Sequence, residues 1–215
     1  LDIKFEETIN IFKNLGVQII DPVNLGIKKE VGDAEFEVLL YEFKEDLNKF
    51  LQNSSPPAPI SNLKELIEFN NKNKDRVMPY FGQEILEMAQ KKGNLESEDY
   101  KKALNLCKTS TGVNGIDLIM KEHNLDALIA PTTNPGCPID LLLGDHYTGS
   151  STEPAAIAGY PSITLPMGYV NEMPVGISIF GAAFSEPILL KIAYNYEQTS
   201  KIRIPPKFLP TISFE

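Results

Sequence analysis

The chain has little cysteine, little histidine and no tryptophan. Its 215 residues include 2 Cys and 2 His. Cys107 and Cys137 are too few for a disulfide framework and too far apart for a Cys-x-x-Cys pair, so we expect two reduced thiols. Reduced thiols are typical of a cytoplasmic protein, and that is the location that we predict.

The scarcity of histidine and cysteine also excludes common metal and nucleophile chemistries. The sequence has no His-Glu-x-x-His motif and no cysteines at ligand spacing, so we expect no metal site. It has no Gly-x-Ser-x-Gly elbow, and His123 follows an expected helix, where an imidazole interacts with the last carbonyl groups. The glycine-rich motifs that bind dinucleotides or nucleotide phosphates are missing too, and we expect no cofactor.

Basic residues are in the minority, and long apolar runs are missing. The 20 Lys and Arg face 29 Asp and Glu, which gives a formal net charge of −9. Nucleic acids and anionic membrane surfaces are bound by clustered Lys and Arg, which this sequence does not have. Gly, Pro or a charged residue interrupts every apolar run before the ~18 residues that a membrane span needs. We therefore expect no nucleic-acid partner and no membrane partner.

What the chain does have is a globular composition, and its two parts differ in the spacing of their apolar residues. Hydrophobic residues make up 42% of the sequence, enough for a substantial core. Residues 1–125 are mainly helical in their apolar spacing, and residues 126–215 contain short apolar strands and a final helix. The pattern predicts an α/β fold with helices around a mixed β-sheet.

The first part contains one strong helix, an early strand and a proline-rich link. Residues 17–20 predict a strand after a first helix, and Asp33 is a plausible N-cap for the strong helix. The apolar residues of that helix form one stripe: Phe36, Leu39, Leu40, Phe43, Leu47, Phe50 and Leu51. The prolines within residues 53–59 predict an irregular link to a helix that Ser61 or Asn62 caps.

A further helix begins after Ser97 and contains two glycines. Gly112 and Gly115 weaken it, although the apolar spacing resumes at Ile116. We expect this helix to end at about His123.

The second part predicts strands bounded by proline and glycine. Residues 127–131 predict a short buried strand, and residues 162–166 and 175–180 predict two neighbouring strands. Pro166 restricts its strand to a sheet edge or a strand end, because proline donates no ladder hydrogen bond. Residues 185–187 (SEP) are typical of a helix start, and we expect the final helix to run to about Thr199.

Three sequence blocks of the second part carry a family resemblance. They are residues 126–132 (DALIAPT), 156–168 (AIAGYPSITLPMG) and 173–181 (MPVGISIFG). In this order the blocks resemble the amidase signature family of serine amide hydrolases. Residues 39–44 (LLYEFK) and 79–84 (PYFGQE) resemble a bacterial subgroup that includes peptide amidases. The resemblance therefore covers nearly the whole chain.

The resemblance implies the C-terminal portion of an amidase-signature-like fold, with residues 1–215 as the C-terminal part of one amidase domain. Members of this family use a Ser-Ser-Lys triad to hydrolyse an amide to carboxylate and ammonia. That triad lies in a Gly/Ser-rich stretch of the N-terminal half, which this sequence does not contain. We therefore expect the N-terminal catalytic half to be absent, no catalytic residue in this chain, and no activity from the chain alone. The start, Leu1-Asp2-Ile3, is not a natural initiator and agrees with a partial gene product.

Two alternatives to a hydrolase of small amides or peptide amides stay open. One is the subunit of an amidotransferase that acts on misacylated tRNA, although this chain has Ala156 where many relatives have Asn. The other is a non-catalytic binding or structural module that retains the fold. The remaining partners that we expect are the missing N-terminal half and a second copy of the chain, because faces normally buried against that half would drive self-association.

Five residues around one loop are candidates for substrate binding: Thr132, Asp145, His146, Ser150 and Ser151. Ser150 and Ser151 precede an expected helix, a position that favours capping, with substrate contact as the alternative. Asp145 and His146 lie in the loop before them, and loops at strand ends often carry binding groups. They either tie the loop to the helix or form a pocket wall that orients the substrate amide.

Overall fold

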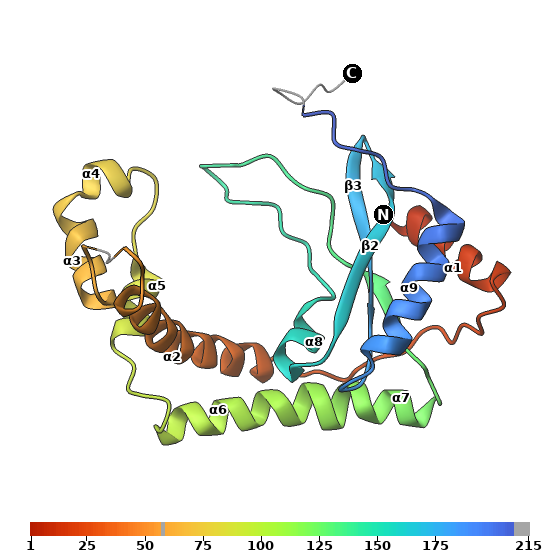
Figure 1. Ribbon diagram of the computed structural model, residues 1–215, viewed down its shortest axis with the longest axis horizontal. Helices are drawn as coiled ribbons and strands as arrows, with labels where there is room; N and C mark the ends of the chain where they lie inside the picture. The colour runs from red at the N-terminus through yellow and green to blue at the C-terminus, as the bar shows by residue number, and fades with distance from the viewer. Residues whose placement is uncertain (57–58, 209–215) are drawn as a thin grey trace.

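The computed structural model describes residues 1–56 and 59–208, in which a small sheet and a group of helices lie at opposite ends of one helical rod (Figure 1). The elements are, in chain order, α1 (Asp2–Asn14), α2 (Glu30–Gln52), α3 (Leu63–Lys72), α4 (Lys74–Val77), α5 (Glu84–Gln90), α6 (Glu98–Lys108), η1 (Thr109–Asp117), α7 (Leu118–Glu122), β1 (Leu128–Pro131), α8 (Glu153–Ala158), β2 (Ser162–Val170), β3 (Met173–Phe180) and α9 (Glu186–Ser200). The rod consists of α6, η1 and α7. It ends at Glu122, just before His123, as predicted.

The sheet has the strand order β1-β3-β2. The combination of helices with this sheet confirms the predicted α/β class. Both strand pairs are antiparallel, and the described residues contain no parallel pair, so the expected mixed sheet is corrected to an antiparallel one. The reason is local, because β2 and β3 form a hairpin, and parallel strands would need a longer crossover. Asn171 and Glu172 both have positive φ, as a two-residue type I′ turn requires.

The strand that contains Pro166 lies at the edge of this sheet, as predicted. Pro166 pairs with Gly176, and the register then shifts between Pro166 and Gly168. A bulge at this point suits a proline, because its nitrogen cannot donate to the ladder.

One face of the sheet packs against α1 and α9, which lie side by side beyond it in Figure 1. Leu165, Ile177 and Ile179 of the strands are buried in this core together with Phe12 of α1 and Tyr196 of α9. The alternate residues of the same strands point to the opposite face. That second face carries the candidate site.

Two predictions for the first 33 residues were wrong: the strand at residues 17–20 and the N-cap at Asp33. Residues 17–29 form no regular structure, and Ile19 packs against the sheet core as part of an extended connection. α2 begins at Glu30, three residues before the expected cap Asp33. In Figure 1 this connection runs from α1 to α2 above the rod.

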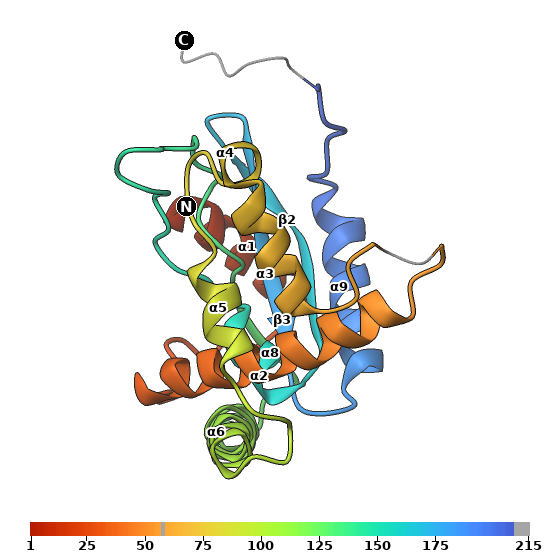
Figure 2. The same ribbon diagram turned by 90° about the vertical axis from the view of Figure 1, so that its left-hand side faces the viewer.

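The apolar stripe predicted for α2 does not face one core. α2 packs against α6 through two smaller residues, Ala34 and Val38, and through Tyr41. Leu40 is buried toward α3 and α5 instead. Leu47 also packs against this second cluster, whereas Phe36, Leu39, Phe43 and Phe50 are exposed, because the close contact with α6 uses the side with the smaller residues. Figure 2 shows α2 passing between α6, seen end-on, and the α3–α5 group.

The glycine-containing part of the rod is a π-helix. η1 spans nine residues between two α-helical segments, where the sequence predicted only a weakened helix. A Cβ on Gly112 would lie 3.1 Å from the Tyr160 hydroxyl, and one on Gly115 would lie 2.8 Å from the Ser110 carbonyl oxygen. The Tyr160 hydroxyl donates a hydrogen bond of 2.7 Å to Asp117. The glycines thus allow the wide turn and the close approach of the segment after α8.

Helix ends and links elsewhere follow the sequence more closely. The Asn62 side chain accepts a hydrogen bond of 3.0 Å from the Glu65 amide and caps α3, as predicted. Gly159 ends α8 in the left-handed conformation. Part of the proline-rich link, residues 57–58, lies outside the described residues. In the part of the chain that the structure describes, no helix combines the length and apolarity needed to cross a bilayer.

Candidate functional site

The candidate site begins where β1 leaves the sheet. A long loop starts at Thr132 and returns at Ser150, and an isolated bridge between Thr133 and Ser150 joins its two ends. The Ser150 hydroxyl donates to the Thr132 carbonyl oxygen at 2.9 Å, and the Ser151 hydroxyl donates to the Pro131 carbonyl oxygen at 2.7 Å. Thr132, Ser150 and Ser151 therefore come together, as three of the five predicted residues.

The role expected for the two serines as helix caps needs correction. The N-cap of α8 is Thr152, and no side chain makes a capping hydrogen bond there. Ser150 and Ser151 bond instead to the carbonyl groups at the end of β1, because the loop returns antiparallel to that segment. They fasten the loop to the sheet.

A triangle of hydroxyl groups lies on the open face of the sheet beside this loop. The Ser178 hydroxyl of β3 donates to the Thr132 hydroxyl at 2.9 Å. The Thr164 hydroxyl of β2 lies 3.3 Å from that of Thr132 and 3.2 Å from that of Ser178. Ser178 is fully buried in the middle strand, while Thr164 is exposed at the edge. Gly176 makes room for the cluster, since a Cβ there would lie 2.9 Å from the Thr132 hydroxyl.

The hydrogen-bond capacity of this triangle defines what it can bind. Ser178 donates to Thr132, and the other two bonds can run in the same direction around the ring. Such a ring uses all three hydroxyl protons and leaves oxygen lone pairs free. In that arrangement the free lone pairs can accept hydrogen bonds from a ligand, such as those that the N–H groups of an amide donate.

The other two predicted residues lie farther along the loop. Asp145 and His146 are exposed, and in the described part of the chain no hydrogen bond joins their side chains to each other or to the hydroxyl triangle. Their backbone carbonyl oxygens are bonded instead: that of His146 accepts from the Asn134 side-chain amide at 3.2 Å, and that of Asp145 accepts from the Tyr147 backbone amide at 2.9 Å. Asp145 and His146 thus do not form a hydrogen-bonded pair in the described part of the chain. A substrate contact by either side chain stays a prediction.

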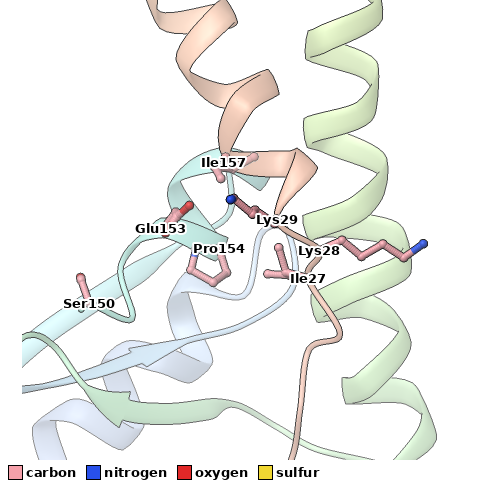
Figure 3. A pocket seen from close by; sticks show the side chains of 8 residues that line it. Ile27, Lys28, Lys29, Ser150, Glu153, Pro154 and Ile157 are labelled. Atoms are coloured by element: carbon pink, nitrogen blue, oxygen red, sulfur yellow. The ribbon is translucent and has the colours of Figure 1, made fainter. Parts of the chain in front are cut away.

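A cavity of about 420 Å³ opens between the start of α2 and the start of α8. It is lined by Ile27, Lys28, Lys29, Gly32, Ser150, Glu153, Pro154 and Ile157. In Figure 3 the Lys29 and Glu153 side chains point toward each other, whereas Lys28 points away and crosses the helical rod. The cavity places one cation and one carboxylate beside Ser150.

A second carboxyl group lies close to Glu153. Burial raises the pKa of Glu35, and the neighbouring Glu153 carboxylate raises it further. Burial also raises the pKa of the Cys107 thiol, with a smaller contribution from Glu35. Among the described residues, no group of three or more His, Cys, Asp or Glu gathers at a spacing that could hold a metal ion.

Sequence reasoning missed the two strand hydroxyls and the cavity residues. Thr164 and Ser178 alternate with buried apolar residues, so their period of two could have identified a polar sheet face. No comparable sequence pattern predicts that Lys29 and Glu153 lie close together, because they belong to segments far apart in the sequence.

Comparison with known proteins places this geometry in a family. A model of the Amidase family matches residues 1–190. A probable amidase of Arabidopsis thaliana is 34% identical over 174 residues, which cover 80% of this chain and 30% of that protein. A solved structure of a peptide amidase in complex with the competitive inhibitor chymostatin matches with a TM-score of 0.90 and 38% identity. That match covers 96% of this chain and 42% of the peptide amidase.

A glutamyl-tRNA(Gln) amidotransferase subunit from Clostridium acetobutylicum is also similar. It is 40% identical over 107 residues, which cover 47% of this chain and 21% of that protein. The chain thus spans less than a third of each of these two curated relatives. The family match includes both the mainly helical part and the strands, which confirms the resemblance seen in the sequence. This chain belongs to the amidase family, the amidase signature enzymes.

Proposed function

We propose that residues 1–215 form the C-terminal part of one amidase domain, in an enzyme that hydrolyses a carboxylic amide to carboxylate and ammonia. The observation that best supports this proposal is the match to the peptide amidase structure, which covers 96% of this chain at 38% sequence identity. The Ser-Ser-Lys residues of the parent enzyme lie outside these 215 residues in this proposal. The free thiols, buried Cys107 and exposed Cys137, fit the cytoplasmic location that we propose.

In this proposal the chain supplies part of the substrate wall. The parent enzyme's serine attacks the amide carbonyl carbon, ammonia leaves with the transferred proton, and water then releases the carboxylate. The hydroxyl oxygens of Thr132 and Thr164, the two members of the triangle that are open to solvent, accept hydrogen bonds from substrate N–H groups. Ser150 and Ser151 hold the loop that frames this face.

A peptide amide is the substrate class that the comparisons favour. The matching structure is that of a peptide amidase, and its competitive inhibitor is chymostatin. An extended peptide amide also presents several N–H donors, which suits a face of hydroxyl acceptors.

The amidotransferase alternative has narrower support. Its match spans 107 residues and 47% of this chain, so about half of the chain has no counterpart in that comparison. The family match includes residues 1–190, and the peptide amidase match covers 96% of the chain. We therefore rank amide hydrolysis above it, and we rank a non-catalytic module below both.

Ammonia release from a peptide amide tests the division between the two halves. The purified 215-residue chain should release none above background, and the parent enzyme should be active. Activity of the chain alone that is lost in a Ser150→Ala/Ser151→Ala variant would show that the nucleophile lies here. An inactive parent enzyme would favour the non-catalytic module.

The loop residues are tested in the parent enzyme. Asp145→Asn and His146→Ala should lower kcat/KM for peptide amides and leave the melting temperature nearly unchanged, because both side chains are exposed. An exposed loop residue without a substrate role, changed by Thr148→Ala, provides the matched control. Wild-type kinetics in both variants, or losses that only follow a lower melting temperature, would contradict a substrate contact.

A further inference from the structure

The chain folds back on the sheet after its last helix. α9 ends at Ser200, and residues 201–208 continue as an irregular segment that leads toward the turn between β2 and β3 (Figure 1). We call residues 201–208 the strap. Ile202 is its one half-buried residue and packs against the sheet core. Ile204 and Phe208 are 60% and 88% exposed, so apolar burial holds little of the strap in place.

Tyr169 of β2 binds one peptide unit of the strap from both sides. Its hydroxyl accepts a hydrogen bond of 2.9 Å from the Ile204 amide and donates one of 3.3 Å to the Ile204 carbonyl oxygen. A phenol can do both, because it has one proton and free lone pairs. The tyrosine thus supplies the two bonds that a residue of a neighbouring antiparallel strand would supply. Pro205 and Pro206 have no amide proton, so Ile204 is the last residue before Lys207 that can donate in this way.

An ion pair attaches the strap at a second point. The Lys207 ammonium lies 2.8 Å from the carboxylate of Glu172, which is part of the turn between β2 and β3. The contact lowers the pKa of Glu172. Both side chains are largely exposed, at 62% and 73%, so water and salt screen the pair. The bonds of Tyr169 are therefore the stronger attachment, and the ion pair is the one that depends on salt.

The turn that receives the strap also touches the loop of the candidate site. Met173 follows Glu172, and a Cβ on Gly136 would lie 3.9 Å from the Met173 methyl carbon. Gly136 belongs to the loop that runs from Thr132 to Ser150. Glu172 has a φ of 63°, a left-handed conformation that is unfavourable for a residue with a Cβ. Contacts that hold this turn therefore bear on the position of Met173 and of the loop beside it.

We propose that the strap is a releasable restraint on the candidate site. Attached at Tyr169 and Glu172, it holds the β2–β3 turn and, through Met173, limits the motion of the loop at Gly136. When it detaches, the loop gains freedom. One tyrosine hydroxyl and one exposed ion pair contribute little free energy, so the attached and detached states both have measurable populations. These contacts do not depend on the proposed function.

Amide hydrogen exchange measures how often the strap detaches from the sheet. Tyr169→Phe keeps the ring and removes both bonds, so the Ile204 amide should exchange about three- to tenfold faster. Glu172→Gln should raise the rate by up to about threefold, and high salt should abolish this difference. Tyr194→Phe, at a 64% exposed tyrosine of α9, and Glu6→Gln on α1 are the matched controls and should leave the rate unchanged. An unchanged rate in Tyr169→Phe would overturn the attachment.

Trypsin provides an independent measure of detachment. Arg203 is exposed, and cleavage after it breaks the peptide bond whose nitrogen belongs to Ile204. The protease needs that amide free of Tyr169, so the cleavage rate follows the detached population. Tyr169→Phe should therefore accelerate cleavage after Arg203 by about the same factor as the exchange. Cleavage as slow as in the unmodified chain would contradict the proposal.

A spin label on Cys137 tests the effect on the loop. Cys137 is exposed and follows Gly136, whereas Cys107 is buried, so a nitroxide reagent labels the loop selectively. Tyr169→Phe/Glu172→Gln should shorten the rotational correlation time of the label by about a third or more. Labels that move equally in this variant and in the unmodified chain, while the Ile204 amide exchanges faster, would show that the strap does not restrain the loop and would overturn the proposal.

Met173 decides whether the effect travels by the proposed route. Met173→Ala should mobilise the label on its own and leave the exchange of the Ile204 amide unchanged. Adding Tyr169→Phe to Met173→Ala should then mobilise the label no further, because the link is already broken. Effects of the two changes that simply add would contradict a route through Met173. None of these readouts uses amide hydrolysis, so their failure is separate from a failure of the proposed function.

Discussion

At the scale of single residues, Ser178 joins the three strands at the candidate site. It is fully buried, and it bonds to hydroxyls that follow β1 and lie on β2. Thr132 and Thr164 are both partly open to water and can replace a lost bond with a water molecule. Ser178 is therefore the member of the triangle whose hydroxyl depends most on the other two.

Replacing this serine should cost a measurable but moderate amount of stability. Ser178→Ala removes one partner of two hydrogen bonds, so we expect the free energy of unfolding to fall by about 1–2 kcal/mol in urea titrations. Ser162→Ala, at an exposed position of β2, should change it by less than about 0.5 kcal/mol. Equal effects in the two variants would contradict the role given to the triangle.

Glu35 gives stability a pH dependence with a definite sign. Burial and the Glu153 carboxylate raise its pKa above the ordinary 4.5, so the folded chain binds this proton more tightly than the unfolded chain. The resulting contribution is fully present below pH 4.5 and is lost as pH rises through the folded-state pKa. Glu35→Gln removes the cost of an ionised carboxylate at this place.

We expect Glu35→Gln to raise the urea midpoint at pH 7 relative to the unmodified chain and to leave it unchanged near pH 4. Glu37→Gln is the informative comparison, because Glu37 pairs with Lys92 at 2.6 Å and its loss should lower the midpoint at pH 7. A Glu35→Gln midpoint below that of the unmodified chain at pH 7 would contradict this account.

At the scale of elements, the π-helix η1 depends on its glycines. Gly115 is buried, and its backbone lies against the Ser110 carbonyl of the same wide turn. A Cβ 2.8 Å from a backbone oxygen cannot be relieved by a side-chain rotation. The surrounding turn has to move if any other residue stands there.

Two glycine substitutions in helices should therefore act in opposite directions. Gly115→Ala should destabilise the chain by about 1–3 kcal/mol, since overpacking shifts buried backbone. Gly32→Ala in α2 has no atom within 4 Å of the added methyl group and should stabilise by up to about 1 kcal/mol. Thermal melts of both variants provide the measurement. A stabilising Gly115→Ala would mean that the wide turn is not required.

The same elements show what the sequence could predict. The β2–β3 hairpin, the edge position of Pro166 and the helix start at Ser185 depend on local chemistry, and the structure confirms them. The strand expected at residues 17–20 was wrong, because a strand needs a partner and the described sheet supplies none there. The exposed side of α2 could not be predicted either, since helical periodicity does not tell which side packs against which neighbour.

The candidate site was predictable in part for the same reason. Thr132, Ser150 and Ser151 lie near the ends of one loop, so their approach follows from a single strand and its return. Thr164 and Ser178 join them only through strand register, which pairs residues that are distant in sequence. The cavity beside Ser150 depends on α2 and α8 meeting, and no local pattern predicts that contact.

At the scale of the whole molecule, the exposed apolar residues are as informative as the core. The loop after β1 carries Ile139, Leu142 and Leu143 at 84%, 94% and 83% exposure. This loop extends between the sheet and the α3–α5 group in Figure 1. The Asp140 carboxylate accepts hydrogen bonds from the Leu142 and Leu143 amides at 2.9 and 3.0 Å, and these bonds lower its pKa. The turn is therefore ordered by polar contacts while its leucines are left uncovered.

Uncovered leucines on an ordered turn should make the isolated chain self-associate. Sedimentation velocity at micromolar concentrations should show a weight-average sedimentation coefficient that rises with protein concentration, because contact between copies removes this apolar surface from water. A Leu141→Gln/Leu142→Gln/Leu143→Gln variant should reduce the rise, whereas Glu6→Gln/Glu197→Gln, which changes exposed polar side chains on α1 and α9, should not. Both variants change exposed side chains, so their far-ultraviolet circular dichroism should match the unmodified chain. A strictly monomeric particle across that range would show that these 215 residues tolerate the exposed leucines without a partner.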